Sequence, residues 1–178
     1  MKEIQILDKK FKEMITGEVI QQRVDELAVI INSDLKDKDV VFLGILNGAF
    51  LFAADLFKRL NIPAQISFVK LASYQGTKSS GTIKELIGWN EEIKGKTVVV
   101  IEDIVDTGHT IERIMAELVM RKAAEIKIAT AFFKPDSYKG NIPIDYVGFE
   151  IPNDFVVGYG LDYDGYGRNL PSIYTLIQ

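Results

Sequence analysis

The stretch VVVIEDIVDTGHT, residues 98–110, runs an apolar segment into two adjacent acids, and then into a third acid with a small polar turn. A short, continuous run of β-branched residues is typical of a strand that is covered on both faces of a sheet. The apolar residues after the turn have the spacing of one helical face: Ile111, Ile114, Met115, Leu118 and Val119. The stretch therefore predicts a buried strand at about 97–101 that leads into a helix at about 110–121.

The same alternation of strand and helix extends in both directions along the chain. Strands are predicted at about 40–46, 66–71 and 126–133, with a helix at about 49–60. An earlier helix is expected after Thr16, its N-cap, because the residues that follow form one apolar stripe: Val19, Ile20, Val24, Leu27, Ile31 and Leu35. This order of elements predicts an α/β fold, in which a mainly parallel sheet is flanked by helices.

Two segments break the alternation. Residues 73–82, SYQGTKSSGT, are polar and rich in glycine and serine, which is typical of either a surface loop or an active-site lid. The tail from about 145 is rich in aromatic residues and glycine. We expect this tail to form short strands and loops that cap the sheet.

Composition limits the class of protein. A chain of 178 residues corresponds to one domain, 1–178, and the lack of cysteine excludes disulfides and thiolate metal sites. The net charge of −4 gives no support for a nucleic-acid partner. The apolar run 40–54 is shorter than the roughly 20 residues that cross a bilayer, and residues 1–14 lack a signal-peptide hydrophobic region. We therefore expect a cytoplasmic protein with no membrane partner.

The polar turn in the opening stretch has the chemistry of a phosphate site. Thr107, Gly108, His109 and Thr110 stand at the start of the predicted helix, where unpaired backbone N–H groups favour an anion. The sequence there matches neither G-x-x-x-x-G-K-[ST] nor G-x-G-x-x-G, which disfavours a triphosphate or dinucleotide site. A cradle for one phosphate is the prediction.

The acids beside this cradle suit a sugar or a metal. Glu102 and Asp103 would repel a phosphate, but their oxygens can accept hydrogen bonds from ribose hydroxyls or bind Mg²⁺. Together with the cradle they predict a ribose 5-phosphate site. The alternative is that the acids end a strand in water and the turn only caps a helix.

The 13-residue pattern resembles the phosphoribosyl diphosphate (PRPP) binding motif of type I phosphoribosyltransferases. The resemblance extends over nearly the whole chain and narrows to the hypoxanthine-guanine phosphoribosyltransferases. It implies the type I fold: a core at about 37–140, a hood built from the N-terminal segment and about 145–178, and a mobile lid at about 73–82. It also implies Mg²⁺ as cofactor, PRPP and a 6-oxopurine as substrates, and a homodimer or homotetramer.

The resemblance assigns roles to individual residues. Asp106 would be the general acid/base on purine N7. The PRPP and ribose 5-phosphate site would comprise Glu102, Asp103, Asp106, Thr107, Gly108, His109 and Thr110. Pyrophosphate would be bound by Leu46, Asn47, Gly48 and Arg168, and the purine by Lys134, Phe155, Val156 and Asp162. Ser73 and Tyr74 would open the lid, and the metal would be held by Glu102, Asp103 and Asp162.

Several of these residues also have simpler interpretations. Lys134 has three donors and no acceptor, so it suits a 6-oxo group better than a 6-amino group, but it could be a surface lysine. Phe155 could belong to the core, Asp106 could only cap a helix, and His109 is best interpreted as a partly exposed loop residue. Asn47 departs from the family, in which many members carry a lysine or arginine at that position.

The implied function is purine salvage: transfer of 5-phosphoribosyl from PRPP to hypoxanthine, guanine or both, giving IMP or GMP and pyrophosphate. One alternative is a transferase for another base, such as xanthine, adenine or a pyrimidine. Another is an RNA-binding regulator that keeps the fold, although the net charge of −4 gives it no support. A third is a nucleotide-binding module without catalysis. The sequence does not rank hypoxanthine against guanine.

Overall fold

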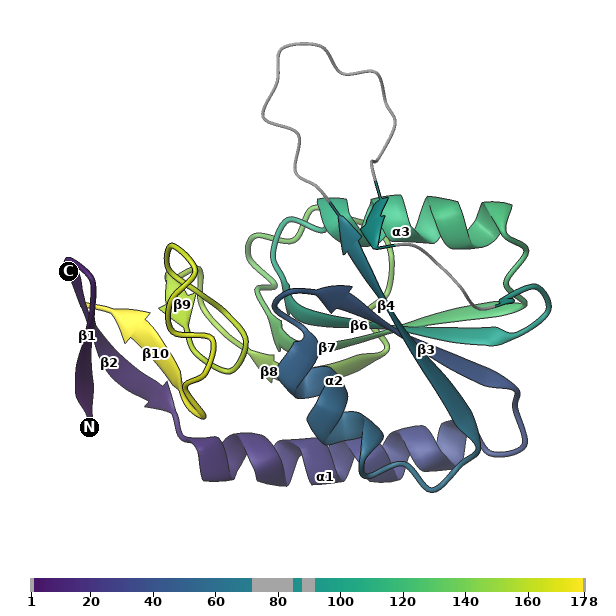
Figure 1. The fold of residues 1–178 in the computed structure, drawn as a ribbon, viewed down its shortest axis with the longest axis horizontal. Helices are drawn as coiled ribbons and strands as arrows, with labels where there is room; N and C mark the ends of the chain where they lie inside the picture. The colour runs from purple at the N-terminus through teal and green to yellow at the C-terminus, as the bar shows by residue number, and fades with distance from the viewer. Residues whose placement is uncertain (1, 72–84, 88–91, 178) are drawn as a thin grey trace, which may run out of the picture.

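The computed structural model describes residues 2–71, 85–87 and 92–177 and contains two sheets. The larger has the strand order β5-β4-β3-β6-β7-β8 (Figure 1). Its strands are β3 (Val40–Leu46), β4 (Ala64–Leu71), β5 (Glu85–Ile87), β6 (Thr97–Val105), β7 (Glu125–Phe133) and β8 (Tyr146–Glu150). The pairs from β4 to β8 are parallel and β5 pairs with β4 antiparallel, so the predicted α/β class with a mainly parallel sheet is confirmed.

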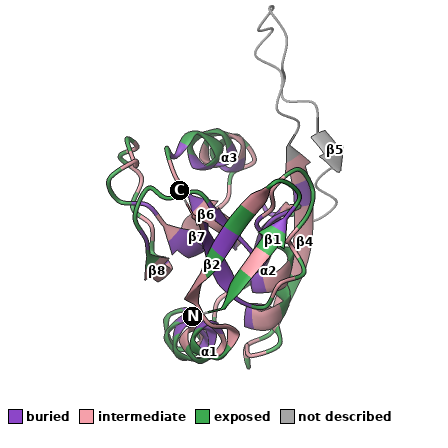
Figure 2. Cartoon of the chain, turned by 90° about the vertical axis from the view of Figure 1, so that its left-hand side faces the viewer, coloured by how far each residue is buried: buried purple, intermediate pink, exposed green. Residues whose placement is uncertain are grey.

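Helices cover both faces of this sheet. They are α1 (Gly17–Asp34), α2 (Phe50–Phe57) and α3 (His109–Met120). Figures 1 and 2 show α1 and α3 on opposite sides of the strands, with α2 on the side of α1. The N-cap of α1 is Thr16, as predicted, and its side chain accepts a hydrogen bond from the backbone N–H of Val19 at 3.5 Å.

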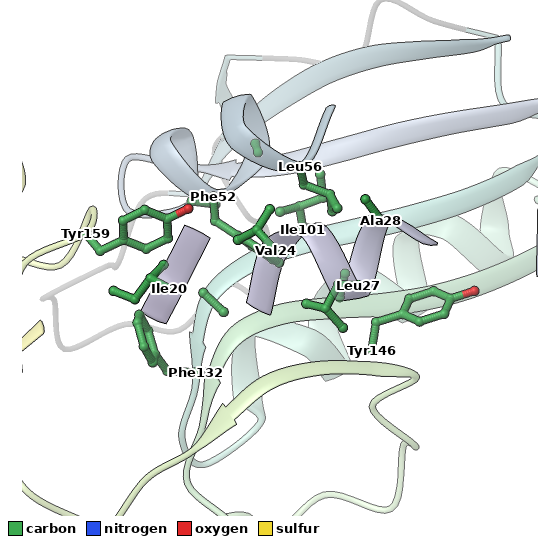
Figure 3. Packing of buried hydrophobic residues seen from close by; sticks show 14 of the residues in the cluster. Ile20, Val24, Leu27, Ala28, Phe52, Leu56, Ile101, Phe132, Tyr146 and Tyr159 are labelled. Carbon is green, nitrogen blue, oxygen red and sulfur yellow. The ribbon is translucent and has the colours of Figure 1, made fainter. Parts of the chain in front are cut away.

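The central strands are buried on both faces because alternate residues point to opposite sides. In β3, Val40 and Phe42 pack in the cluster under α1 and α2, whereas Val41 and Leu43 pack in the cluster under α3. Figure 3 shows the first cluster, in which side chains of α1 and α2 meet residues of the sheet and Tyr159 of the hood. This two-sided burial explains the continuous apolar runs in the sequence.

The smaller sheet forms a hood from the two ends of the chain. Its strands are β1 (Glu3–Ile6), β2 (Lys9–Ile15), β9 (Val156–Val157) and β10 (Ile173–Leu176), in the order β1-β2-β10-β9. All of its pairs are antiparallel. The hood has its own small core around Phe11, Val157 and Tyr174.

The structure differs from the sequence prediction in three places. Strand β6 continues to Val105 because its last residues pair with β7, so the acid pair lies inside the strand. Strand β8 belongs to the larger sheet, although the whole tail from about 145 was expected in the hood. Arg23 of α1 donates hydrogen bonds to the carbonyl oxygens of Val147 and Gly148, both at 2.9 Å, which ties β8 to the core.

The third difference concerns the edges of two apolar stripes. Val19 and Val119 were assigned to buried helical faces, but they are 48% and 63% exposed. Both lie beside the stripe that packs against the sheet. Among the helices of the described residues, none has the length and apolarity needed to cross a membrane.

Candidate active site

The predicted site residues converge at the carboxyl ends of three neighbouring strands. Asn47 follows β3, Asp106 follows β6 and Lys134 follows β7. Strand β4, which follows β3 in the chain, lies on one side of β3. Strands β7 and β8, which follow β6, lie on the opposite side of β6, so the direction in which strands are added reverses between β3 and β6. Ligands of open α/β sheets bind at such a reversal, outside the carboxyl ends of the strands.

A pocket of about 390 Å³ opens at this position. It brings together residues that are distant in sequence, from the loop after β3, the end of β6, the start of α3 and the hood. The lining residues are Ile45, Leu46, Asn47, Gly48, Glu102, Asp103, Ile104, Thr110, Arg113, Asp162 and Arg168. All four residues predicted to bind pyrophosphate and all three predicted to bind metal are among them.

The loop after β3 lies directly against the acid pair. The peptide bond between Leu46 and Asn47 is cis. A Cβ atom built on Gly48 would overlap the carboxylate of Asp103. Only glycine therefore lets this loop approach the acid pair, and its backbone forms one wall of the pocket.

The acid pair is largely removed from water. Glu102 is 6% exposed, and its carboxylate accepts a hydrogen bond from the backbone N–H of Asp103 at 3.2 Å. Burial raises the pKa of Glu102 well above its usual value, and the charge of Asp103 raises it further. Burial also raises the pKa of Asp103, although hydrogen bonds and the charge of Arg168 partly oppose that shift. Two acids in this setting favour a ligand that supplies hydroxyl donors or positive charge.

The turn between β6 and α3, where an anion cradle was predicted, leads directly into the first turn of α3. Gly108 has φ +93°, and the ring of Tyr138 occupies the space where a side chain would extend. Thr107, His109 and Thr110 are exposed around it. The His109 side chain is 79% exposed and lies 3.7 Å from the carboxylate of Glu112, which agrees with its interpretation as an exposed residue.

Asp106 and Lys134 face each other beside this cradle. The Nζ atom of Lys134 donates to Oδ2 of Asp106 at 3.3 Å. The Lys134 side chain is 10% exposed, whereas that of Asp106 is 46% exposed. Lys134 is therefore not a surface lysine, and the accessible carboxylate of Asp106 can meet a ligand.

The hood contributes an aromatic surface and an ion pair. Phe155 is 45% exposed, which contradicts a core role, and the centroid of its ring lies 6.0 Å from that of Tyr163. Val156 is buried in β9. Arg168 pairs with Asp162 at 2.6 Å and donates to the carbonyl oxygen of Gly160 at 2.6 Å. Asp106, Lys134, Phe155 and Val156 lie outside the lining of the 390 Å³ pocket.

The carboxylates of Glu102, Asp103 and Asp162 supply oxygen ligands of the kind that Mg²⁺ prefers. Within residues 2–71, 85–87 and 92–177 they do not form a group of three or more that encloses a metal by itself. Mg²⁺ is usually held by one or two carboxylates together with phosphate groups of a substrate. The three acids fit that manner of binding.

The sequence prediction missed Arg113 and Tyr138, as well as Ile45 and Ile104, which line the pocket. Arg113 lines the pocket, and its position three residues after Thr110 on a helix was the signal that could have revealed it. Tyr138 packs on Gly108 and hydrogen-bonds the carbonyl oxygen of Ile142 at 2.6 Å, but nothing in the local sequence indicates this contact. The predicted lid, with Ser73 and Tyr74, lies outside the described residues.

Comparison with known proteins identifies the family of the chain. The phosphoribosyl transferase domain family matches residues 13–164. The hypoxanthine-guanine phosphoribosyltransferase of Aquifex aeolicus is 42% identical over 178 residues, 99% of each chain, and that of Bacillus subtilis is 40% identical, with 93% of this chain and 92% of that protein covered. The crystal structure of a hypoxanthine phosphoribosyltransferase from Staphylococcus aureus superposes with a TM-score of 0.87 at 40% identity, covering 93% of this chain and 91% of that chain. The chain therefore belongs to the phosphoribosyl transferase family, within its branch of hypoxanthine-guanine phosphoribosyltransferases.

Proposed function

We propose that this protein transfers the 5-phosphoribosyl group of PRPP to hypoxanthine or guanine, giving IMP or GMP and pyrophosphate. The observation that carries the proposal is the 3.3 Å contact between Lys134 Nζ and Asp106 Oδ2 at the ends of adjacent strands. In a 6-oxopurine, O6 and N7 are neighbours on one edge of the base. A lysine donor beside a carboxylate acceptor is complementary to that edge, with Lys134 on O6 and Asp106 on N7.

The remaining site residues suit PRPP. The backbone N–H groups at the start of α3 would bind the 5-phosphate, and Glu102 and Asp103 would accept hydrogen bonds from the ribose hydroxyls. The loop of Asn47 and Gly48, together with Arg168, would hold the diphosphate. The 390 Å³ pocket supports this assignment because it joins the loop, the acid pair and Arg168 in one space.

The reaction then needs one bond exchange and one proton transfer. Nitrogen N9 of the purine attacks the anomeric carbon, and the bond from that carbon to the diphosphate oxygen breaks, with inversion. The proton on N7 moves to the carboxylate of Asp106, which is suited to the task because it is accessible and its oxygens can accept a proton. Arg168 stabilises the negative charge that develops on the leaving diphosphate.

Mg²⁺ is part of the proposal. When bound, it would neutralise charge on the diphosphate and make it a better leaving group. Asp103 and Asp162 would hold it together with phosphate oxygens, and the nearly buried Glu102 would complete the acidic wall. Phe155 would stack on the purine, and its 45% exposure in the hood supports this role. The homodimer or homotetramer and the cytoplasmic location stay predictions.

The test is release of pyrophosphate from PRPP and Mg²⁺ with hypoxanthine, guanine, xanthine and adenine in separate reactions. Rapid release with hypoxanthine or guanine and little with adenine is the expected result. Asp106→Asn should lower kcat by about 10²- to 10⁴-fold while PRPP still binds, because the variant cannot accept the N7 proton. PRPP binding without release for any of the four bases would refute the proposal and favour a regulatory or other-base role.

A further inference from the structure

Helix α3 carries a cation into the pocket that none of the preceding assignments uses. Arg113 lies one helical turn after Thr110, and both residues line the 390 Å³ pocket. Ile111 and Ile114 are each 1% exposed against the sheet. Because these two residues fix the rotation of α3, they also fix the direction in which Arg113 leaves the helix.

Arg113 lacks a protein partner in the part of the chain that the structure describes. The other arginine of the pocket, Arg168, is engaged by Asp162 and by the carbonyl oxygen of Gly160. No hydrogen bond or ion pair joins Arg113 to any residue in 2–71, 85–87 or 92–177. A guanidinium presents five N–H donors and is always charged, so those donors are available to a ligand.

The charges that line the pocket make this cation important for an anionic ligand. Three acids, Glu102, Asp103 and Asp162, face two arginines. The loop after β3 contributes Asn47, which is neutral, so that loop can offer amide donors but no positive charge. A polyphosphate that enters a pocket with more acids than bases gains from each cation that no acid already engages.

The position of Arg113 indicates whether it meets the 5-phosphate or the diphosphate of PRPP. The pocket includes Thr110 and Arg113 but excludes Thr107, Gly108 and His109, whose turn would hold the 5-phosphate. Arg113 therefore shares one pocket with Asn47 and Gly48 of the loop after β3, whereas Thr110 is the one residue of the cradle that lines it. We propose that Arg113 binds a phosphate oxygen of the diphosphate of PRPP and supplies the positive charge that the loop after β3 lacks. This assignment rests on the proposed function of the site.

Binding measurements with three probes in the presence of Mg²⁺ test the assignment. PRPP carries both the 5-phosphate and the diphosphate, inorganic pyrophosphate corresponds only to the leaving diphosphate, and IMP carries only the 5-phosphate. Arg113→Ala should weaken PRPP and pyrophosphate binding by about 10- to 100-fold, the range of a charge-assisted hydrogen bond. IMP binding should change by less than about threefold. Arg113→Lys should recover part of the loss, since it keeps the charge but not the planar fork.

A matched control removes a lysine at the opposite ends of the strands from the pocket. Lys36 is exposed in the turn before β3, at the amino ends of the strands. Lys36→Ala changes the net charge as Arg113→Ala does and should leave all three affinities unchanged. Steady-state rates give a second readout, because a group that binds PRPP equally in the ground and transition states should raise the KM for PRPP and leave kcat nearly constant.

The outcomes separate this inference from the proposed function. If Arg113→Ala binds pyrophosphate as tightly as the wild type, or loses as much affinity for IMP as for pyrophosphate, the role of Arg113 is overturned. Activity of the wild-type enzyme would still support the proposed function in that case. A wild-type protein that binds neither PRPP nor pyrophosphate would overturn both. Thermal unfolding of each variant shows whether it is folded, and Arg113→Lys keeps the test decisive if the alanine variant is unstable.

Discussion

Replacing Lys134 by methionine tests whether this side chain recognises the purine base, because the change should affect base binding much more than folding. The Lys134 side chain is 10% exposed, and its ammonium group donates to Asp106 at 3.3 Å. Methionine has a similar unbranched length, so it fills the same space without the charge. The change removes the donor proposed for O6 of the purine and leaves the carboxylate of Asp106 in position.

The structure sets the size of two effects. The Lys134–Asp106 pair is long and half of Asp106 faces solvent, so its loss should cost less than about 1 kcal/mol of folding stability. The lost hydrogen bond from a charged group to the base should cost about 1.5–3 kcal/mol. At 1.4 kcal/mol for each tenfold change, kcat/KM for hypoxanthine should fall by about 10- to 150-fold. The value for adenine should stay level or rise, because its 6-amino group no longer meets an ammonium.

Steady-state rates with hypoxanthine, guanine and adenine at saturating PRPP measure this change in specificity. Lys127→Met is the control, since Lys127 lies in the same strand and pairs with Asp145 at 3.4 Å, at the other end of β7. An equal loss of kcat/KM for hypoxanthine and adenine would refute the reasoning. It would mean that Lys134 acts through Asp106 and does not recognise the base.

Two further predictions concern the loop after β3 and the folding stability of the protein at low pH. Gly48→Ala should raise the KM for PRPP at least tenfold, because the new Cβ would displace Asp103 or the loop; an unchanged KM in a folded variant would contradict this. Burial alone would raise the pKa of Asp55, but hydrogen bonds, including one from Tyr159, outweigh it and hold the pKa below its usual 3.8. Since the folded pKa is the lower one, this carboxylate stabilises the fold above about pH 4 and loses that contribution as the pH falls below 3.8. Asp55→Asn should therefore cost about 1 kcal/mol in urea unfolding at pH 7, and the difference should shrink near pH 3; a constant difference would contradict the linkage.

The sequence alone determined the parts of the site that are close together along the chain. In residues 98–110 the strand, the acid pair, the phosphate turn and the helix start follow each other directly. Their order reflects local preferences: β-branched residues for a buried strand, glycine for a positive φ and an apolar stripe for a helix. The class of fold follows from the same preferences, because alternating strands and helices must cover both faces of a parallel sheet.

Only the tertiary structure decided which of these pieces meet. Lys134 reaches Asp106 across 28 residues because β6 and β7 are neighbours, and strand order depends on packing and not on local preference. Strand β8 joins the larger sheet by pairing with β7, and Arg23, 124 and 125 residues away, adds hydrogen bonds to its carbonyl oxygens. In the sequence, Arg113 is one of several charges on a predicted exposed helical face. It lines the pocket because the buried isoleucines on either side of it fix how α3 packs on the sheet. Local sequence sets which surfaces must be buried, but the partner that buries each surface is set by the whole chain.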